Sequence, residues 1–214
     1  MNNYHIYEEV GRGKYSVVYK GRKKKSIEYV AVKSVERGRR KKLMDEVAIF
    51  QIIQNDHIRQ SQANSQLAEG AQAMAGGGGN DSSGGSSNAG GAGSALSNWH
   101  PNILKFYNWY ETRNHFWIIF EHCVGGDLQS LLEQDKKLPE DTVKKFAYEM
   151  LEGLSYLHSQ GIIFGDLKPS NVLMNEYCKL KLCDFGLAKK VTDLSSIGMK
   201  NSAEERASSH SQAS

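Results

Sequence analysis

Long apolar runs are missing from this sequence of 214 residues. Its densest apolar stretch, residues 116–120, is far shorter than the roughly 20 residues that a membrane-spanning helix needs. The polar residues after Met1 also lack the basic start and the apolar run of a secretory signal. We therefore expect neither a membrane span nor a signal for export.

Cysteine is scarce as well. The three cysteines, Cys123, Cys178 and Cys183, are an odd number, and their spacing fits neither a disulfide framework nor a metal site. Reduced thiols are typical of the cytosol and the nucleus. The cytoplasm is the location that we predict.

A large charge of one sign is also missing. The net charge is only +3 at pH 7, although Lys and Arg gather at residues 22–25 and 37–42. Such runs are most often solvated connections, but they also attract acidic partners such as a microtubule, an anionic membrane or a nucleic acid. No aromatic residues alternate with these runs, which disfavours specific binding of nucleic acid.

The patterns that are present predict an α+β fold. Residues 4–35 hold short β-rich runs separated by polar turns, and residues 42–53 have helical spacing. Residues 106–110 and 116–120 have the pattern of two more strands. Together they predict five antiparallel strands and one helix, organised as residues 1–53 and 100–121.

The chain becomes helical after Gly125-Gly126, within a second part that we place at residues 122–191. A hairpin is predicted at residues 172–174 and 180–183. A longer helix is expected at residues 139–158. Its apolar stripe is Val143, Phe146, Met150, Leu154 and Leu157.

Two segments have a composition typical of disorder. Residues 54–99 are rich in Gly, Ser, Ala, Asn and Gln and hold ten of the 21 glycines, and residues 192–214 are rich in Ser. We expect the first to be a disordered insertion and the second a disordered tail.

A glycine-rich segment lies between the first two predicted strands. Its small residues, Gly11, Gly13 and Ser16, would let backbone N–H groups close over phosphates. Lys33 ends the third predicted strand and would place its ammonium group under this loop. Each feature alone is also compatible with an ordinary hairpin or strand.

A lysine that holds phosphates needs a carboxylate to position it. The predicted helix offers Asp45 and Glu46. Inward packing of Val47 and Phe50 favours Glu46, with Asp45 as the alternative.

Two later motifs carry groups for phosphoryl transfer. Residues 165–171 supply Asp166 to orient an attacking hydroxyl, Lys168 for the transferred group, and the amide oxygen of Asn171 for Mg²⁺. Asp184, which opens Asp-Phe-Gly, would hold Mg²⁺ at the β- and γ-phosphates. In this order the elements predict a phosphotransfer site that uses ATP and Mg²⁺.

Residues 4–191, apart from the insertion, resemble a eukaryotic-type serine/threonine protein kinase. Lys168, two positions after Asp166, resembles the serine/threonine class. Residues 4–13, 19–25 and 109–112 are similar to the Fused and Unc-51-like kinases, most of all to the plant Runkel type. That likeness implies large proteins with C-terminal helical repeats and roles around microtubules, cilia or cell division.

The resemblance also implies roles for the residues around a nucleotide. It makes residues 121–123 the hinge, with Glu121 and Cys123 beside the adenine, and Phe120 the gatekeeper. Asp127 would reach the ribose. The residues that would enclose the adenine are Val10, Val18, Ala31 and Leu173.

The chain departs from the kinase pattern in two places. It has Phe164-Gly165 where kinases usually carry His-Arg, and that arginine normally pairs with a phosphorylated activation loop, so we expect this switch to be absent. The family's internal hydrophobic stack would place Phe50, Phe106, Phe164 and Phe185 in one column.

The second departure is truncation. No Ala-Pro-Glu-like anchor follows Asp184-Phe185-Gly186. We therefore expect an incomplete, mostly helical large lobe that leaves apolar surface exposed on the helix at 139–158. A partial gene model, a splice form and a deliberate fragment are alternative origins.

Two functions from different classes follow. The first is a protein kinase that transfers the γ-phosphate of ATP to a Ser or Thr hydroxyl of a protein substrate. The second is an ATP-binding pseudokinase scaffold with a microtubule or cell-division role. A truncated isoform that competes with its full-length relative is a third, and for all of them cytoskeletal association is an expectation.

Overall fold

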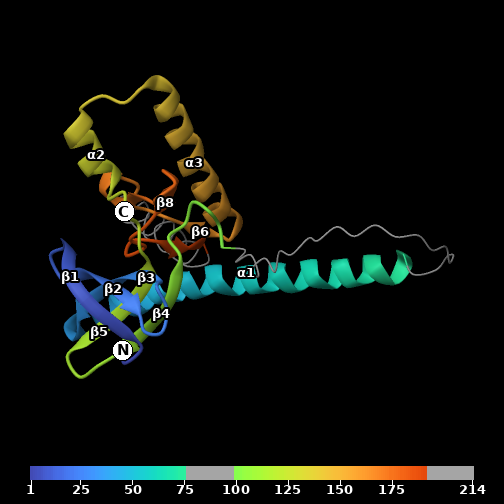
Figure 1. Ribbon diagram of the computed structural model, residues 1–214, viewed down its shortest axis with the longest axis horizontal. Helices are drawn as coiled ribbons and strands as arrows, with labels where there is room; N and C mark the ends of the chain where they lie inside the picture. The colour runs from blue at the N-terminus through green and yellow to red at the C-terminus, as the bar shows by residue number, and fades with distance from the viewer. Residues whose placement is uncertain (76–98, 192–214) are drawn as a thin grey trace, which may run out of the picture.

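An antiparallel sheet forms the first part of the fold (Figure 1). The computed structural model describes residues 1–75 and 99–191. Every neighbouring pair of strands in this five-stranded sheet is antiparallel, as predicted. In spatial order the strands are β1 (Tyr4–Arg12), β2 (Ser16–Lys23), β3 (Tyr29–Glu36), β5 (His115–Glu121) and β4 (Phe106–Glu111).

One helix packs against this sheet. A short 3-10 turn, η1 (Arg37–Arg39), leads into α1 (Arg40–Ala75). The buried residues of α1 recur at three- to four-residue spacing, as expected for a helix with one face on a core. The apolar ones are Leu43, Val47, Ile49, Phe50 and Ile53, and they share a core cluster with Val35, Phe116 and Ile118 of the sheet.

The predicted insertion is wrong at its N-terminal end, because α1 continues to Ala75 and runs out past the body of the molecule (Figure 1). Residues 54–75 are mostly Gln, Ala and other good helix formers with a single glycine, Gly70, and no proline, so helix propensity outweighs the low complexity. Tertiary contacts help: the buried His57 ring stacks on Trp99 at 5.2 Å and on Tyr156 at 5.4 Å. Residues 76–98 of the insertion and 192–214 of the tail lie outside the described residues.

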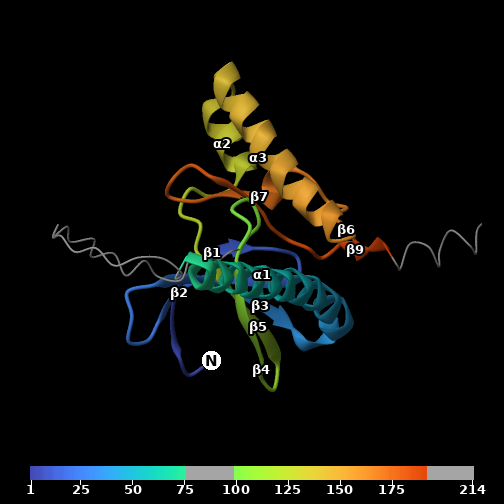
Figure 2. The ribbon, with the colours of Figure 1, turned by 90° about the vertical axis from the view of Figure 1, so that its right-hand side faces the viewer.

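The second part of the fold holds two helices and short strands. In the view turned by 90° it lies at the opposite end of the molecule from the sheet (Figure 2). β6 pairs with β9 and β7 pairs with β8, which confirms the predicted hairpin. The elements are α2 (Leu128–Asp135), α3 (Glu140–Ser159), β6 (Ile162–Ile163), η2 (Pro169–Asn171), β7 (Val172–Met174), β8 (Leu180–Leu182) and β9 (Lys189–Lys190).

The apolar stripe of α3 is only partly buried. Phe146 and Leu157 lie in the core, but Val143 is exposed, which corrects its place in the predicted stripe. Val143 lies in the first turn of α3, before the buried residues of that helix begin at Phe146. Tyr148 and Leu151 are exposed as well. The expected exposed apolar surface on this helix is therefore present.

A single core cluster spans both parts of the fold. It runs from the sheet and α1 to α3, β7 and β8. This continuity fixes the two parts against each other at the site between them. Within the residues described, no helix is long and apolar enough to cross a membrane.

Candidate active site

The glycine-rich segment is the turn between β1 and β2. Gly11 pairs with Val18 in the strand register, and the N–H of Gly13 donates to the carbonyl of Ser16 at 2.8 Å. A Cβ on Gly13 would lie 3.1 Å from the Ser16 hydroxyl oxygen. Glycine therefore keeps this turn tight and leaves room for a ligand close to the backbone.

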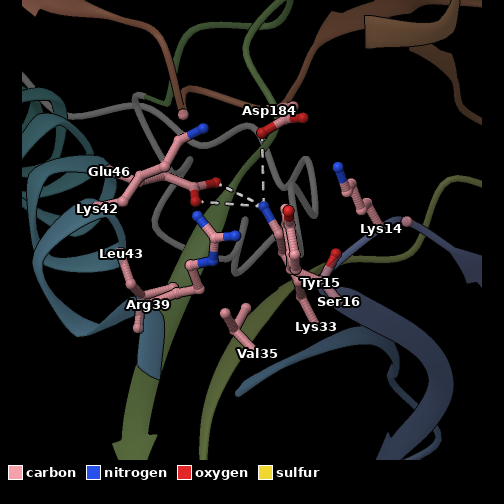
Figure 3. Close-up of a pocket in the computed structure, with 12 residues that line it drawn as sticks. Lys14, Tyr15, Ser16, Lys33, Val35, Arg39, Lys42, Leu43, Glu46 and Asp184 are labelled. Atoms are coloured by element: carbon pink, nitrogen blue, oxygen red, sulfur yellow. Dashed lines mark hydrogen bonds and ion pairs between the residues drawn. The ribbon is translucent and has the colours of Figure 1, made fainter. Parts of the chain in front are cut away.

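Lys33 lies on β3 between two carboxylates (Figure 3). Its Nζ donates to both carboxylate oxygens of Glu46, at 2.9 and 3.2 Å, and lies 3.5 Å from Oδ1 of Asp184. Burial alone lowers the pKa of Lys33, but the charges of Glu46 and Asp184 outweigh it, so the pKa is raised and the ammonium group stays charged. Glu46 is buried and Asp45 is exposed, so the structure brings Glu46 rather than Asp45 to the lysine.

Asp166 lies in the loop before η2 and is held by two side chains. Lys168 Nζ donates to Asp166 Oδ2 at 2.8 Å. Asn171 Nδ2 donates to the same oxygen at 2.8 Å and to the Asp166 carbonyl at 2.9 Å. The hydrogen bond from Lys168, reinforced by that from Asn171, lowers the pKa of Asp166 and favours its ionised carboxylate.

A cavity of about 710 Å³ lies between the two parts of the fold. Its volume is within the usual range for small-molecule sites. Its lining includes Lys33, Asn171 and Asp184, together with residues of the hinge and apolar side chains. The lining also includes every residue predicted from the glycine-rich segment or from the resemblance to lie around a nucleotide: Val10, Gly11, Gly13, Ser16, Val18, Ala31, Glu121, Cys123, Asp127 and Leu173.

Two of these residues have additional partners. Asp127 caps α2, with its carboxylate accepting from the Ser130 N–H at 2.9 Å and from the Ser130 hydroxyl at 3.0 Å. The Glu121 carboxylate accepts from Lys181 Nζ at 2.8 Å and from the Lys105 N–H at 2.6 Å. Lys181 is buried on β8, so this ion pair ties the hinge to the strand that leads to Asp184.

Asn171 and Asp184 fit a role as ligands of Mg²⁺. The amide nitrogen of Asn171 is committed to Asp166, which leaves its amide oxygen for a cation. Residues 1–75 and 99–191 contain no group of three or more His, Cys, Asp or Glu that would hold a metal alone. A magnesium ion would therefore need phosphate oxygens to complete its shell, as is usual for this ion at nucleotide sites.

Four phenylalanines form the predicted column behind the cavity. Phe50 stacks on Phe106 with 5.3 Å between ring centroids and meets Phe185 at 4.8 Å. Phe164 meets Phe185 at 5.1 Å, and all four rings are buried. Phe120 also contacts Phe50, at 5.2 Å, so the predicted gatekeeper closes the cavity by joining the column.

Comparison with known proteins agrees with this geometry. The family model described as protein kinase domain matches residues 94–207. The chain belongs to the protein kinase family. The serine/threonine-protein kinase RUNKEL of Arabidopsis thaliana is 45% identical over 195 residues, which are 91% of this chain and 11% of that protein.

Two mouse kinases are similar over almost the same span. The serine/threonine-protein kinase ULK4 is 33% identical over 88% of this chain and 11% of its own length. The serine/threonine-protein kinase 36 is 31% identical over 90% of this chain and 12% of its own length. The chain thus spans about a tenth of the length of these relatives. The expected kinase fold and the membership of a serine/threonine kinase family are confirmed.

The departure from the usual kinase motif has a local explanation. Gly165 has φ +76°, and a Cβ there would lie 2.9 Å from the carbonyl oxygen of Leu187. Any larger residue at this place in the kinase would have to move the segment after Asp184. The preceding Phe164 supplies a ring to the column instead of a polar side chain.

Cys183, just before Asp184, is a poor target for modification in this kinase. Its side chain is buried, and burial raises the pKa of its thiol. The thiolate is the reactive form of cysteine. The buried environment of Cys183 therefore disfavours reaction of its thiol.

Sequence reasoning missed two sets of residues at the site. One is the ion pair of Lys181 with Glu121, which no local motif marks. The other is Lys14, Arg39 and Lys42, which converge beside Lys33. The cationic run at residues 37–42 contains Arg39 and Lys42 and is the signal in the sequence for the second set. Such runs are more often solvated connections, so the run alone does not predict a site.

Proposed function

We propose that the protein to which this chain belongs transfers the γ-phosphate of ATP to a Ser or Thr hydroxyl of a protein substrate. One observation carries the proposal: Lys33 is held by Glu46 and Asp184 in the lining of a nucleotide-sized cavity. Positioned cations and carboxylates are what phosphoryl transfer requires, because its catalysis is almost entirely positioning and charge stabilisation.

Each side chain has a definite task in this proposal. Lys33 would bind the α- and β-phosphates, while Glu46 keeps its ammonium group in place. Asp166 would accept the proton of the Ser or Thr hydroxyl as that oxygen bonds to the γ-phosphorus and the bond to the ADP oxygen breaks. Lys168 would offset the negative charge on the transferred group, and Asn171 with Asp184 would hold Mg²⁺, which neutralises the phosphates.

The same chemistry suggests where the protein acts. Reduced thiols and the likeness to RUNKEL lead us to propose a cytoplasmic kinase whose partners include cytoskeletal proteins. The proposed partners are those of the whole protein. In the relatives RUNKEL and ULK4, about nine tenths of the length lies outside the span that matches this chain.

Calorimetry of ATP binding, with and without Mg²⁺, tests the site. We expect metal-dependent binding that Lys33→Met and Asp184→Asn abolish. Glu46→Gln should weaken binding by about tenfold or more, since it breaks a buried charge-assisted hydrogen bond. The matched control is Asp45→Asn, its exposed neighbour, which should bind ATP as the wild type does.

Phosphotransfer is tested separately in the full-length protein. Wild type should phosphorylate Ser or Thr peptides, and Asp166→Asn should not while still binding MgATP. Binding of MgATP without any transfer by the wild type would make the protein an ATP-binding scaffold. A folded chain that binds no ATP would refute the nucleotide site itself.

A further inference from the structure

A second cavity, of about 230 Å³, opens beside Lys33 (Figure 3). It lies between the turn that joins β1 to β2, the start of α1 and the segment at Asp184. Lys14, Arg39 and Lys42 line this cavity and do not line the larger one. The two cavities share Gly13, Ser16, Lys33, Glu46 and Asp184 in their linings, so the three cations face a space that adjoins the nucleotide cavity at Lys33.

The charges that line the second cavity do not balance. Its cations are Lys14, Lys33, Arg39 and Lys42, and its anions are Glu46 and Asp184. Both carboxylates are already close to Lys33, at 2.9 and 3.5 Å. Among the residues that the structure describes, none of the other three cations forms an ion pair, although neighbouring Arg37 and Arg40 both pair with Glu111.

Two of the cations lie over the same aromatic ring. The Arg39 guanidinium lies 3.6 Å from the centroid of the Tyr15 ring, and Lys14 Nζ lies 5.2 Å from it. A guanidinium that stacks by its flat face keeps its N–H edge for hydrogen bonds, and that edge matches a phosphate in geometry. Tyr15 thus orders Arg39 without neutralising it.

Lys42 places a positive charge beside Gly186, in the segment that Asp184 opens. Its Nζ lies 3.9 Å from the place that a Cβ on Gly186 would take. Lys42 is also near enough to Asp166 to act on its ionisation. Kinases usually carry an arginine at the position of Gly165, and among the described residues that line this cavity Lys14, Arg39 and Lys42 are the cations without a paired carboxylate.

We propose that Lys14, Arg39 and Lys42 bind a phosphoserine or phosphothreonine side chain of the protein substrate, close to the hydroxyl that becomes phosphorylated. The kinase would then prefer substrates that already carry a phosphate. This inference rests on the proposed function, because it names the substrate class of the same site. A dianion suits the cavity better than a carboxylate does, since three cations surround it and an arginine edge can donate two parallel hydrogen bonds.

Binding of a labelled, degenerate peptide pool with one phosphoserine tests the proposal. Fluorescence anisotropy is measured with the chain saturated by Mg²⁺ and a non-hydrolysable ATP analogue, beside pools that carry serine or aspartate instead. We expect the phosphoserine pool to bind best. Arg39→Met and Lys42→Met should each weaken its binding by about tenfold to a hundredfold.

Three controls make the outcome decisive. Lys41→Met removes an exposed charge from the same helix that lines neither cavity, and it should leave binding unchanged. Lys14→Met, on a different element, gives an independent variant if a change in α1 lowers stability. Calorimetry of ATP binding on every variant shows whether a substitution affects the nucleotide cavity as well as peptide binding.

The outcomes distinguish this inference from the proposed function. Normal ATP binding with equal binding of all three pools would overturn the inference and leave the nucleotide site intact. Loss of ATP binding in Arg39→Met and Lys42→Met would assign these cations to the nucleotide instead. Pool binding that appears only after phosphatase treatment of the chain would mean that a phosphate of the chain itself fills the cavity, which also overturns the proposal.

Discussion

Replacing Phe164 by alanine should unfold the kinase at a clearly lower temperature. The Phe164 ring is 2% exposed and meets Phe185 at 5.1 Å, as the last member of the aromatic column. Truncating a buried phenylalanine to alanine costs about 3–5 kcal/mol, because the lost burial is combined with a cavity. For a domain of this size that cost corresponds to a fall in Tm of roughly 6–20 °C.

Nucleotide affinity should fall in the same variant. Phe185 follows Asp184 directly, so a cavity beneath the Phe185 ring loosens the carboxylate that faces Lys33. Differential scanning calorimetry gives the Tm, and titration with MgATP at a temperature well below the Tm of the variant gives the affinity. Both should change together, because one packing contact supports both properties.

A matched control is available in the turn between β7 and β8. Tyr177 is also aromatic but 75% exposed, and Tyr177→Ala should change stability by no more than about 0.5 kcal/mol. Phe164→Leu, which keeps most of the buried volume, should lie between Phe164→Ala and the wild type. If Phe164→Ala had the same Tm as Tyr177→Ala, the aromatic column would have no role in stability and the reasoning would fail.

Two further predictions concern the backbone and the thiols. Gly165→Ala should lower the free energy of thermal unfolding by about 1–2 kcal/mol, because an L residue is strained at φ +76°. A variant as stable as the wild type would show that the Leu187 carbonyl does not hinder a Cβ at this position. Ellman's reagent at pH 8 should label exposed Cys178 rapidly, half-buried Cys123 much more slowly and buried Cys183 only after denaturation, because burial raises the pKa of Cys183 and raises that of Cys123 to about 12. Cys178→Ser should remove the fast phase, and a fast phase that persists would contradict the assigned burial.

The nucleotide cavity was predictable because its chemistry depends on short motifs. Lys33, Asp166 and Asp184 are each marked by neighbours within a few residues, and the family pattern fixes their order along the chain. The choice of Glu46 over Asp45 needed only helical periodicity, since one face of the helix packs inward. Local patterns of this kind can be recognised from the sequence alone.

The length of α1 was not predictable in the same way. Residues 54–99 combine a helix-forming first half with a glycine-rich second half. The average composition of the whole segment is typical of disorder. The stacking of His57 on Trp99 and Tyr156 joins residues that are about 40 and 100 positions apart, and only the fold reveals it. Long-range contacts of this kind decide where a marginal helix continues.

Contacts along α1 also explain how the site can be assembled without a phosphorylated loop and its arginine. Glu46 reaches Lys33, Phe50 lies inside the aromatic column, and Asp56 accepts a hydrogen bond from the Tyr156 hydroxyl at 3.1 Å. These three contacts hold the helix to the sheet, to the segment at Asp184 and to α3. One rigid helix carries all three contacts. Displacing Glu46 from Lys33 would therefore also break the aromatic column and the contact with α3. The packing thus favours the arrangement in which Lys33 is paired with Glu46.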